Sequence, residues 1–359
     1  LYRLGDFYEM FFEDAELLSH ELELTLTGRN AGLDERVPMC GVPHHAVDIY
    51  IDKLIKKGYK VAICEQLEDP KNAKGIVKRD ITEVISSGSV ITSNSLNEKE
   101  NNYIASLYSL EYCYILTYAD ITTGEIYSEI LENDNNIIIN KIIYLNIKEI
   151  IASSKVSKDI ISALKHIYKF PLTITDNLYE ENNYDYITTG ISDNRYLLGT
   201  KHLIYYLTIN LKRNISHFQK LNIRINNEYL KMDIHTKRNL ELTESIRNKE
   251  RMYSLLWLLD ETKTAMGGRL LKSWIESPLL DIDKINHRYD IISTLLNEFI
   301  LNEELRKYLY DVYDLERLCG RIALGSANAK DLIQLKESLK ILPEINNILK
   351  KINYTTIPD

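Results

Sequence analysis

The sequence predicts a multidomain protein in which two α/β domains precede an all-α domain. A chain of 359 residues is too long for one ordinary hydrophobic core, which favours two or three domains. Up to about residue 231, segments with the two-residue apolar period of strands alternate with segments that have the helical period. From Met232 onward only the helical period remains.

Residues 1–91 are expected to form a mixed-sheet α/β domain. The expected elements are a strand over 2–9, a helix over 14–24, a short strand over 24–27, a loop over 28–36, a helix over 43–55 and a buried strand over 59–64. The second helix has a clear C-terminal stop, because Lys56 and Lys57 in its last turn precede Gly58.

A polar linker over 92–102 is expected to lead into a second α/β domain over 103–231. Its expected elements are strands over 112–121 and 125–130, a helix over 137–145, a strand over 149–153, a helix over 158–168, a strand over 172–175 and a long helix over 196–212. Thr122-Thr123-Gly124 predicts a hairpin turn between the first two strands. The later alternation of helix and strand favours a parallel component in the sheet.

Residues 232–359 are expected to be helical. Pro278 and Pro343 interrupt the helical pattern of apolar residues, and each is expected to end a helix. Because helical segments continue up to Asp359, we expect this region to be only the first part of a larger domain.

Composition limits the class of protein without identifying a function. Hydrophobic residues make up 45% of the chain and charged residues 27%, as in ordinary globular proteins. A net charge of −8 disfavours nucleic acid on average, although local basic patches can override the average. The sequence contains no secretory signal and no apolar run of membrane-spanning length, so no membrane partner is expected. The four scattered cysteines are typical of reduced thiols in a cytoplasmic protein.

Several short segments carry a specific residue pattern. They are 3–11 (RLGDFYEMF), 37–46 (VPMCGVPHHA), 61–66 (VAICEQ), 120–124 (DITTG), 233–242, 264–271 (TAMGGRLL), 314–317 (DLER) and 321–324 (RIAL). In this order they resemble segments of the MutS family, whose members recognise mismatched DNA. One departure is Ser86-Ser87-Gly88-Ser89, where the family usually has Thr-Pro-Gly-Thr, and loss of the proline is expected to loosen this turn.

The resemblance implies what each block of the chain is. Residues 1–91 correspond to the mismatch-recognition domain, 103–231 to a connector domain with a ribonuclease H-like fold, and 232–359 to the first part of the helical core or lever domain. The family's clamp and ATPase domains are expected beyond residue 359.

Phe7 and Glu9 are the central candidates for DNA recognition. On a strand these two side chains share one face, and Tyr8 points to the other. The resemblance implies that Phe7 wedges at a mispaired or unpaired base from the minor groove while Glu9, either ionised or protonated, hydrogen-bonds that base. A mispaired base costs less to unstack, by about a few kcal/mol, and this difference provides discrimination. Without the resemblance, the same pattern fits an amphipathic strand with an ordinary core phenylalanine.

Further residues are expected to contact the DNA backbone or line the groove. These candidates are Arg3, Leu4, Asp6, Arg29, Met39, Lys74, Lys78 and Arg79, with Arg36 as a weaker one. For the basic residues the alternative is a solvated surface side chain, and for Met39 it is apolar packing.

Parts of the sequence also fit two other site chemistries and one other class of protein. Cys40, His44 and His45 lie close in sequence, but a structural zinc site needs four ligands and the chain offers no second close pair. Asp120 stands near the end of a strand where ribonuclease H-like nucleases hold metal, but two-metal chemistry needs three or four clustered carboxylates, and only Glu125 and Glu149 are near. Asp120→Asn is therefore expected to leave folding unchanged. A pure interaction scaffold without DNA affinity is the third possibility, which the net charge mildly favours.

The resemblance also implies partners and cofactors. The expected partners are double-stranded DNA with mispaired or unpaired bases and MutL, which would bind through the connector. Residues 1–359 contain no GxxxxGK[ST] loop, so we expect ATP and magnesium to bind in the ATPase domain of the family, and this chain to need no cofactor and to be no enzyme. We expect a homodimer when full length, a monomer for this chain alone, and a bacterial cytoplasmic, nucleoid-associated location.

Overall fold

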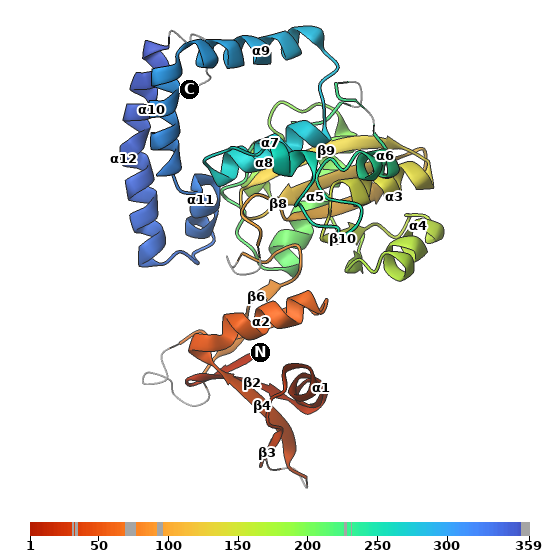
Figure 1. The fold of residues 1–359 in the computed structure, drawn as a ribbon. Coiled ribbons are helices and arrows are strands. Elements are labelled where there is room, and N and C mark those ends of the chain that lie inside the picture. The colour runs from red at the N-terminus through yellow and green to blue at the C-terminus, as the bar shows by residue number, and fades with distance from the viewer. Residues whose placement is uncertain are drawn as a thin grey trace.

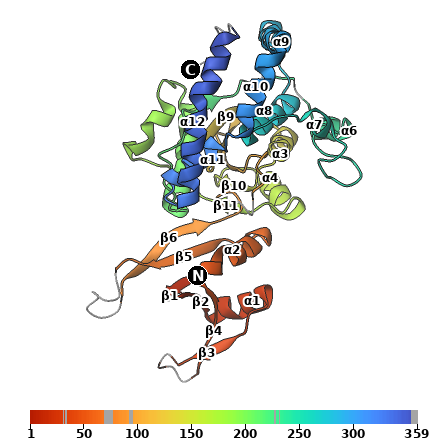
Figure 2. The same cartoon turned by 60° about the vertical axis from the view of Figure 1, so that its left-hand side comes forward.

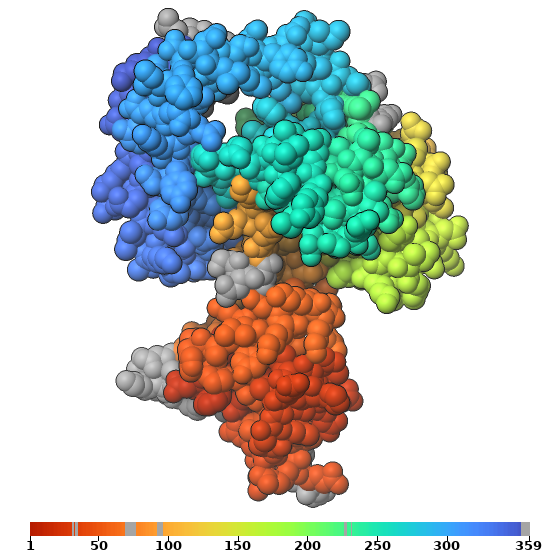
Figure 3. Space-filling model, viewed as in Figure 1, coloured from red at the N-terminus to blue at the C-terminus, as the bar shows by residue number. Residues whose placement is uncertain are grey.

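The computed structural model describes residues 1–30, 32, 35–68, 77–91, 96–225, 228–230 and 232–352. Three regions follow one another along the chain (Figure 1): a small α/β domain, a larger domain built on a second sheet, and an array of helices. The space-filling view (Figure 3) shows the first domain projecting away from the other two. This architecture confirms the predicted fold class of two α/β regions followed by helices.

The first domain is a six-stranded mixed sheet with two helices. Its elements are β1 (Tyr2–Leu4), β2 (Phe7–Phe11), α1 (Phe12–Leu22), β3 (Thr27–Arg29), β4 (Val37–Pro43), the short η1 (His44–Ala46), α2 (Val47–Lys56), β5 (Val61–Gln66) and β6 (Arg79–Ile85). The strand order is β3-β4-β2-β1-β5-β6. Only β1 and β5 run parallel, and the other neighbours are antiparallel.

The single strand expected over 2–9 is wrong, because the chain reverses at its middle. Gly5 has φ +59°, a left-handed value that glycine adopts without a Cβ penalty, and β1 and β2 form an antiparallel hairpin around it. The hairpin places Leu4 opposite Phe7 and Tyr2 opposite Glu9. Strands β4 and β6 were not predicted, and β3 lies a few residues later than expected.

The two helices cover one face of this sheet and leave the other uncovered (Figure 2). Tyr8, Met10 and Val42 belong to the buried clusters that α1 and α2 complete. Phe7, one position from Tyr8, keeps 47% of its surface exposed. The alternation of a strand therefore divides β2 into a core face and an open face.

The second domain is a six-stranded sheet with buried side chains on both faces. Its elements are β7 (Tyr103–Ser109), β8 (Cys113–Asp120), β9 (Glu125–Glu132), α3 (Asn135–Tyr144), β10 (Glu149–Ala152), α4 (Lys158–Ser162), η2 (Ala163–Ile167), β11 (Leu172–Ile174), η3 (Asn182–Thr188), α5 (Asn194–Tyr205), η4 (Tyr206–Asn210) and β12 (Asn222–Ile223). The strand order is β11-β10-β7-β8-β9-β12. One apolar cluster forms beneath α5 and another beneath α3 and α4.

The second sheet contains the predicted parallel component, whereas strands β7 and β12 were not predicted. Strands β7, β8 and β9 form an antiparallel meander, and β10 and β11 extend it in parallel next to β7. The predicted hairpin is present, and the Gly124 amide closes its turn by donating to the Asp120 carbonyl at 2.9 Å. The helices predicted over 158–168 and 196–212 are present, but each ends in a short π-helical segment.

The third region contains helices only among its described residues. They are α6 (Ile234–Asn239), α7 (Leu255–Leu259), α8 (Ala265–Glu276), α9 (Ile282–Asn297), α10 (Phe299–Tyr310), α11 (Leu315–Ala323) and α12 (Ala329–Lys351). Pro278 separates α8 from α9, as predicted, but the interruption expected at Pro343 is wrong, because this proline lies inside α12. Packing of α12 against α10 through Leu305 and Ile348 offsets the missing backbone donor. No helix of the described residues is long and apolar enough to cross a membrane.

The first and second domains meet at a polar junction. Lys60 Nζ lies 2.8 Å from Oε1 of the fully buried Glu149 and donates to the Thr173 hydroxyl at 2.7 Å. The turn at 86–89, expected to be loose without its proline, is closed by the Ser89 hydroxyl, which accepts from the Ser86 amide at 2.8 Å. The turn is buried against this junction.

The end of the linker is held by the helical region. Arg269 of α8 donates to the Glu98 carbonyl at 2.8 Å, and Arg317 of α11 donates to the carbonyls of Asn97 and Glu100 at 3.0 and 2.5 Å. Lys272 adds an ion pair with Glu100 at 3.1 Å. We call residues 97–100 the captured linker.

Candidate nucleic-acid interface

The open face of the first sheet carries Phe7 and Glu9. Phe7 is the first residue of β2 and pairs with Leu4 of β1 on one side and Pro43 of β4 on the other. Glu9, two positions on, pairs with Tyr2 and Gly41. The two side chains therefore share a face, and the 4% exposure of Tyr8 confirms that it points the opposite way.

Apolar and basic candidates surround these two residues on the same face. Leu4 is half-buried directly opposite Phe7, and Met39 is half-buried opposite Phe11. Arg29, at the end of β3, extends toward β2, and its Nη1 donates to Glu9 Oε2 at 3.3 Å. An exposed aromatic ring, a carboxylate and a guanidinium thus meet on one surface.

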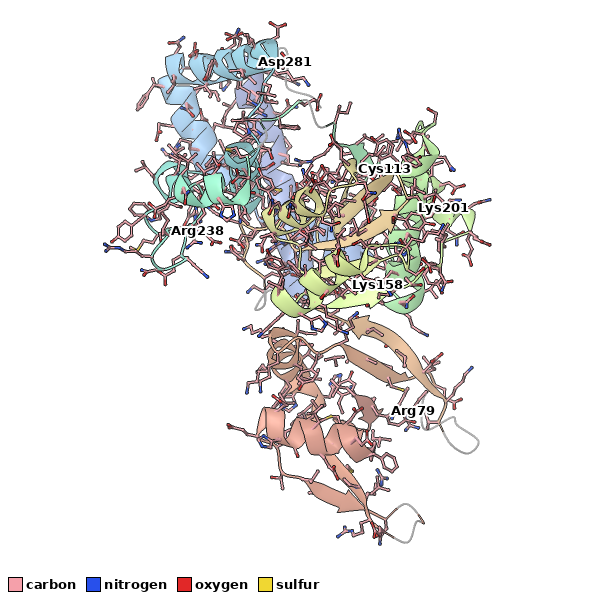
Figure 4. All side chains as sticks on the ribbon, turned by 90° about the vertical axis from the view of Figure 1, so that its right-hand side faces the viewer. Arg79, Cys113, Lys158, Lys201, Arg238 and Asp281 are labelled. Atoms are coloured by element: carbon pink, nitrogen blue, oxygen red, sulfur yellow. The ribbon has the colours of Figure 1, made fainter. Side chains whose placement is uncertain are left out.

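Arg79 joins this face from its other side. Its guanidinium lies 5.4 Å from the centre of the Tyr2 ring, and its Nε donates to the Arg3 carbonyl at 3.1 Å. Figure 4 labels Arg79 on the first sheet, far from the labelled residues of the second domain. Because Arg79 pairs with Gln66 in the ladder between β5 and β6, its backbone position is fixed by the sheet.

Arg3, Asp6 and Lys78 do not lie beside Phe7 and Glu9 in the same way. Arg3 points to the face of Tyr8, with its guanidinium 5.3 Å from that ring centre. Asp6 is exposed at the β1–β2 turn, where its carbonyl accepts from the His44 amide at 2.8 Å. Lys78 is exposed just before β6, and Lys74 falls outside the described residues. Their predicted roles stay predictions.

The core face of β2 fixes the orientation of the open face. The Tyr8 hydroxyl donates to Glu65, and its ring stacks on His44 with centroids 5.7 Å apart. Burial, reinforced by the hydrogen bond to the Glu65 carboxylate, raises the pKa of Tyr8 well above its usual value. Tyr8 is therefore a neutral side chain whose ring, packed on the core face, turns Phe7 and Glu9 to the open face.

Two of the three residues considered for zinc, Cys40 and His44, have other partners. Cys40 is buried in the cluster under α1, and its Sγ donates to the Ala15 carbonyl at 3.4 Å. His44 stacks on Tyr8. Among the described residues, no group of three or more potential ligands is placed to hold a metal ion.

The carboxylate of Asp120 has a structural environment. It is fully buried and accepts from the Thr122 amide and hydroxyl at 2.9 and 2.6 Å, from the Asn102 amide at 2.9 Å and from the Asn101 side chain at 3.4 Å. These contacts argue against the expectation that Asp120→Asn leaves folding unchanged, because an amide group would turn a donor toward these donors.

Sequence reasoning missed two residues of the open face, Tyr2 and Gly41. Tyr2 is 37% exposed and lies between Glu9 and Arg79, and its ring meets Phe11 edge-on at 6.4 Å. Recognition of Gly5-Asp6 as a two-residue hairpin loop would have placed Tyr2 opposite Glu9. Gly41 could be found only through the pairing of β2 with β4, for which no local signal exists.

Comparisons with known proteins point to one family. Residues 1–94 match the family described as MutS domain I, and residues 235–357 match MutS domain III. The chain is 45% identical over 345 residues to the DNA mismatch repair protein MutS of Bacillus mycoides (strain KBAB4), covering 96% of this chain and 39% of that protein. It is 44% identical, with the same coverage, to the proteins of the same name from Bacillus cereus (strain G9842) and Bacillus thuringiensis (strain Al Hakam). The chain thus spans about two fifths of the length of these relatives.

Proposed function

Because this chain belongs to the MutS family of DNA mismatch repair proteins, we propose that the open face of its first sheet reads mispaired or unpaired bases in duplex DNA. The observation that carries this proposal is the pair formed by Phe7 and Glu9. A ring that is 47% exposed stands on a rigid paired strand, with a carboxylate two positions away on the same face.

Phe7 is suited to act as the wedge. Its backbone is fixed between β1 and β4, so the ring is presented at the end of a hairpin without the ordering cost of a loop. A ring inserted from the minor groove unstacks a base step and bends the duplex. A mispaired base yields to this insertion at lower cost than a paired one, which makes the wedge selective.

Glu9 is suited to hydrogen-bond the displaced base. A carboxylate among phosphates disfavours binding to any duplex, so it must gain a contact that only a displaced base offers. Arg29 and Arg79 flank it and supply the positive charge that a backbone contact needs. In this proposal the phosphate contacts hold the duplex and Phe7 and Glu9 provide discrimination.

The test compares dissociation constants of the complete protein for a mismatched and a matched duplex at one fixed salt concentration. Phe7→Ala should reduce the preference for the mismatch by about 1–3 kcal/mol, the value of one base–aromatic stack, with little change for the matched duplex. Glu9→Ala should reduce discrimination while binding of matched DNA becomes tighter.

Tyr8→Phe is the matched control, because it changes the neighbouring residue on the opposite face. It removes one hydrogen bond to Glu65 and should leave the ratio of the two dissociation constants unchanged. A wild-type ratio in Phe7→Ala together with a lost ratio in Tyr8→Phe would contradict the proposal.

The remaining assignments belong to the same proposal. The second domain acts as a non-catalytic connector that passes the binding signal onward and contacts MutL, and the complete protein works as a homodimer in the bacterial cytoplasm at the nucleoid. ATP and magnesium act outside residues 1–359, so the purified chain should hydrolyse no ATP. Turnover that a substitution within these residues abolishes would contradict this assignment.

A further inference from the structure

The contact between Arg29 and Glu9 links two groups that the proposed function treats separately. Arg29 lies on β3 and Glu9 on β2, and β4 runs between these strands. Their side chains nevertheless meet, with Arg29 Nη1 3.3 Å from Glu9 Oε2. Among the described residues, the Glu9 carboxylate accepts its hydrogen bond from Arg29.

Gly41 of β4 provides the passage for this contact. It is the cross-strand partner of Glu9, and a Cβ at Gly41 would lie 3.4 Å from Glu9 Cγ and 3.2 Å from the Tyr8 carbonyl oxygen. The contact with the backbone oxygen is closer than usual, so a side chain at Gly41 would shift the neighbouring strand by a few tenths of an ångström, and its Cβ would touch the Glu9 side chain. The Glu9 side chain therefore lies across the glycine toward Arg29.

Arg29 retains donors for a second partner. A guanidinium has five N–H donors, of which the contact with Glu9 uses one. The Arg29 side chain is 55% exposed, whereas that of Glu9 is 17% exposed. One cation can thus hold the carboxylate and face a phosphate at the same time.

We propose that Arg29 and Gly41 determine mismatch specificity by positioning Glu9, in addition to any phosphate contact of Arg29. The inference rests on the proposed function. Arg29 fixes where the Glu9 carboxylate points and compensates its charge beside the phosphates, and Gly41 leaves the space that this orientation needs. Arg29 acts through Glu9 and is a positioning residue for base recognition.

The experiment is a double-mutant cycle in the complete protein with Arg29→Gln, Glu9→Gln and the double variant. Each is titrated with a duplex containing one G·T pair and with its matched counterpart at one salt concentration. In the presence of Glu9, Arg29→Gln should reduce the mismatch preference about two- to fivefold, the range expected for an exposed ion pair. In the Glu9→Gln background, Arg29→Gln should weaken binding of both duplexes equally and leave the preference for the mismatch unchanged.

Two further variants sharpen the test. Gly41→Ala keeps every charge and should lower the preference in the presence of Glu9 but not in Glu9→Gln, and an unchanged preference would overturn the role of Gly41. Lys57→Gln is the matched control, because it breaks an ion pair of similar exposure with Glu21 on the helical side of the domain. It should change neither dissociation constant.

The outcomes separate the inference from the function on which it rests. If Phe7→Ala and Glu9→Gln both keep the wild-type preference, the proposed function fails. If they lower it while Arg29→Gln has the same effect with and without Glu9, Arg29 is only a phosphate contact and the positioning role is overturned.

Discussion

Removing Arg269 should strongly destabilise the helical region. The Arg269 side chain is 5% exposed and makes a bidentate pair with Asp314, at 2.7 and 2.8 Å, and a contact to Glu316 at 2.5 Å. Its fourth bond, to the Glu98 carbonyl, holds the captured linker. Arg269→Met keeps most of the volume but removes the guanidinium donors of the half-buried Asp314 carboxylate and of the Glu98 carbonyl.

The expected loss is about 3–5 kcal/mol of unfolding free energy, the usual cost of removing one partner from a buried ion pair. Burial alone would raise the pKa of Asp314, but the hydrogen bonds and charge of Arg269, together with those of Arg317, outweigh burial and hold that pKa below its usual value. The favourable electrostatics thus depend on Arg269. Arg269→Met combined with Asp314→Asn should recover part of the stability, because Asp314, the less exposed of the two carboxylates, then no longer carries an unpaired charge.

Tryptophan fluorescence during urea unfolding provides a local assay, because the two tryptophans of the sequence, Trp257 and Trp274, lie on α7 and α8. Arg306→Met is the control: this arginine is 37% exposed and stands 3.7 and 3.9 Å from its nearest carboxylates, so its loss should cost at most about 1 kcal/mol. Equal shifts of the unfolding midpoint in Arg269→Met and Arg306→Met would refute the reasoning.

Three further predictions concern buried polar groups. Asp120→Asn should destabilise the second domain by about 1–3 kcal/mol in denaturant unfolding followed by circular dichroism, because it disrupts the bonds from Thr122. Burial lowers the pKa of His202 in the folded protein. The stability that the neutral imidazole contributes is therefore complete above the unfolded pKa of about 6.5 and is lost as pH falls toward the folded pKa. His202→Gln should flatten this decline in stability between pH 7 and 5. Burial would raise the pKa of Asp260, but hydrogen bonds from Lys99, Thr262 and Arg251 outweigh burial and lower this pKa. The stability detected by tryptophan fluorescence should therefore be retained above about pH 4 and fall at lower pH, and the fall should be less steep in Asp260→Asn.

Local signals in the sequence were sufficient for much of the fold. The β8–β9 hairpin followed from Thr122-Thr123-Gly124, and Gly124 has the left-handed φ of +77° that such a turn favours. The alternation of Phe7, Tyr8 and Glu9 gave the correct faces, because a period of two survives in a strand whatever its neighbours are.

Features that depend on partners distant in sequence could not be predicted. Arg29 meets Glu9 only because β4 pairs between their strands and carries a glycine at the crossing. Pro343 was expected to end a helix, a local rule that packing between α10 and α12 overrides. The phosphate contact predicted for isolated basic residues such as Lys78 depends on a surface that the chain alone does not specify.

The capture of the linker also imposes a sequence of events during synthesis. The carbonyl of Glu98 precedes its donor Arg269 by 171 residues, and that of Asn97 precedes Arg317 by 220. At about 5–20 residues per second, a ribosome needs roughly 10–40 s to supply these donors after the linker has emerged. During that interval the first domain can complete its own core and can meet the second domain through Lys60, but the linker has no contact with the helices that hold it later. The attachment of the linker to the helical region is therefore among the last features that translation fixes.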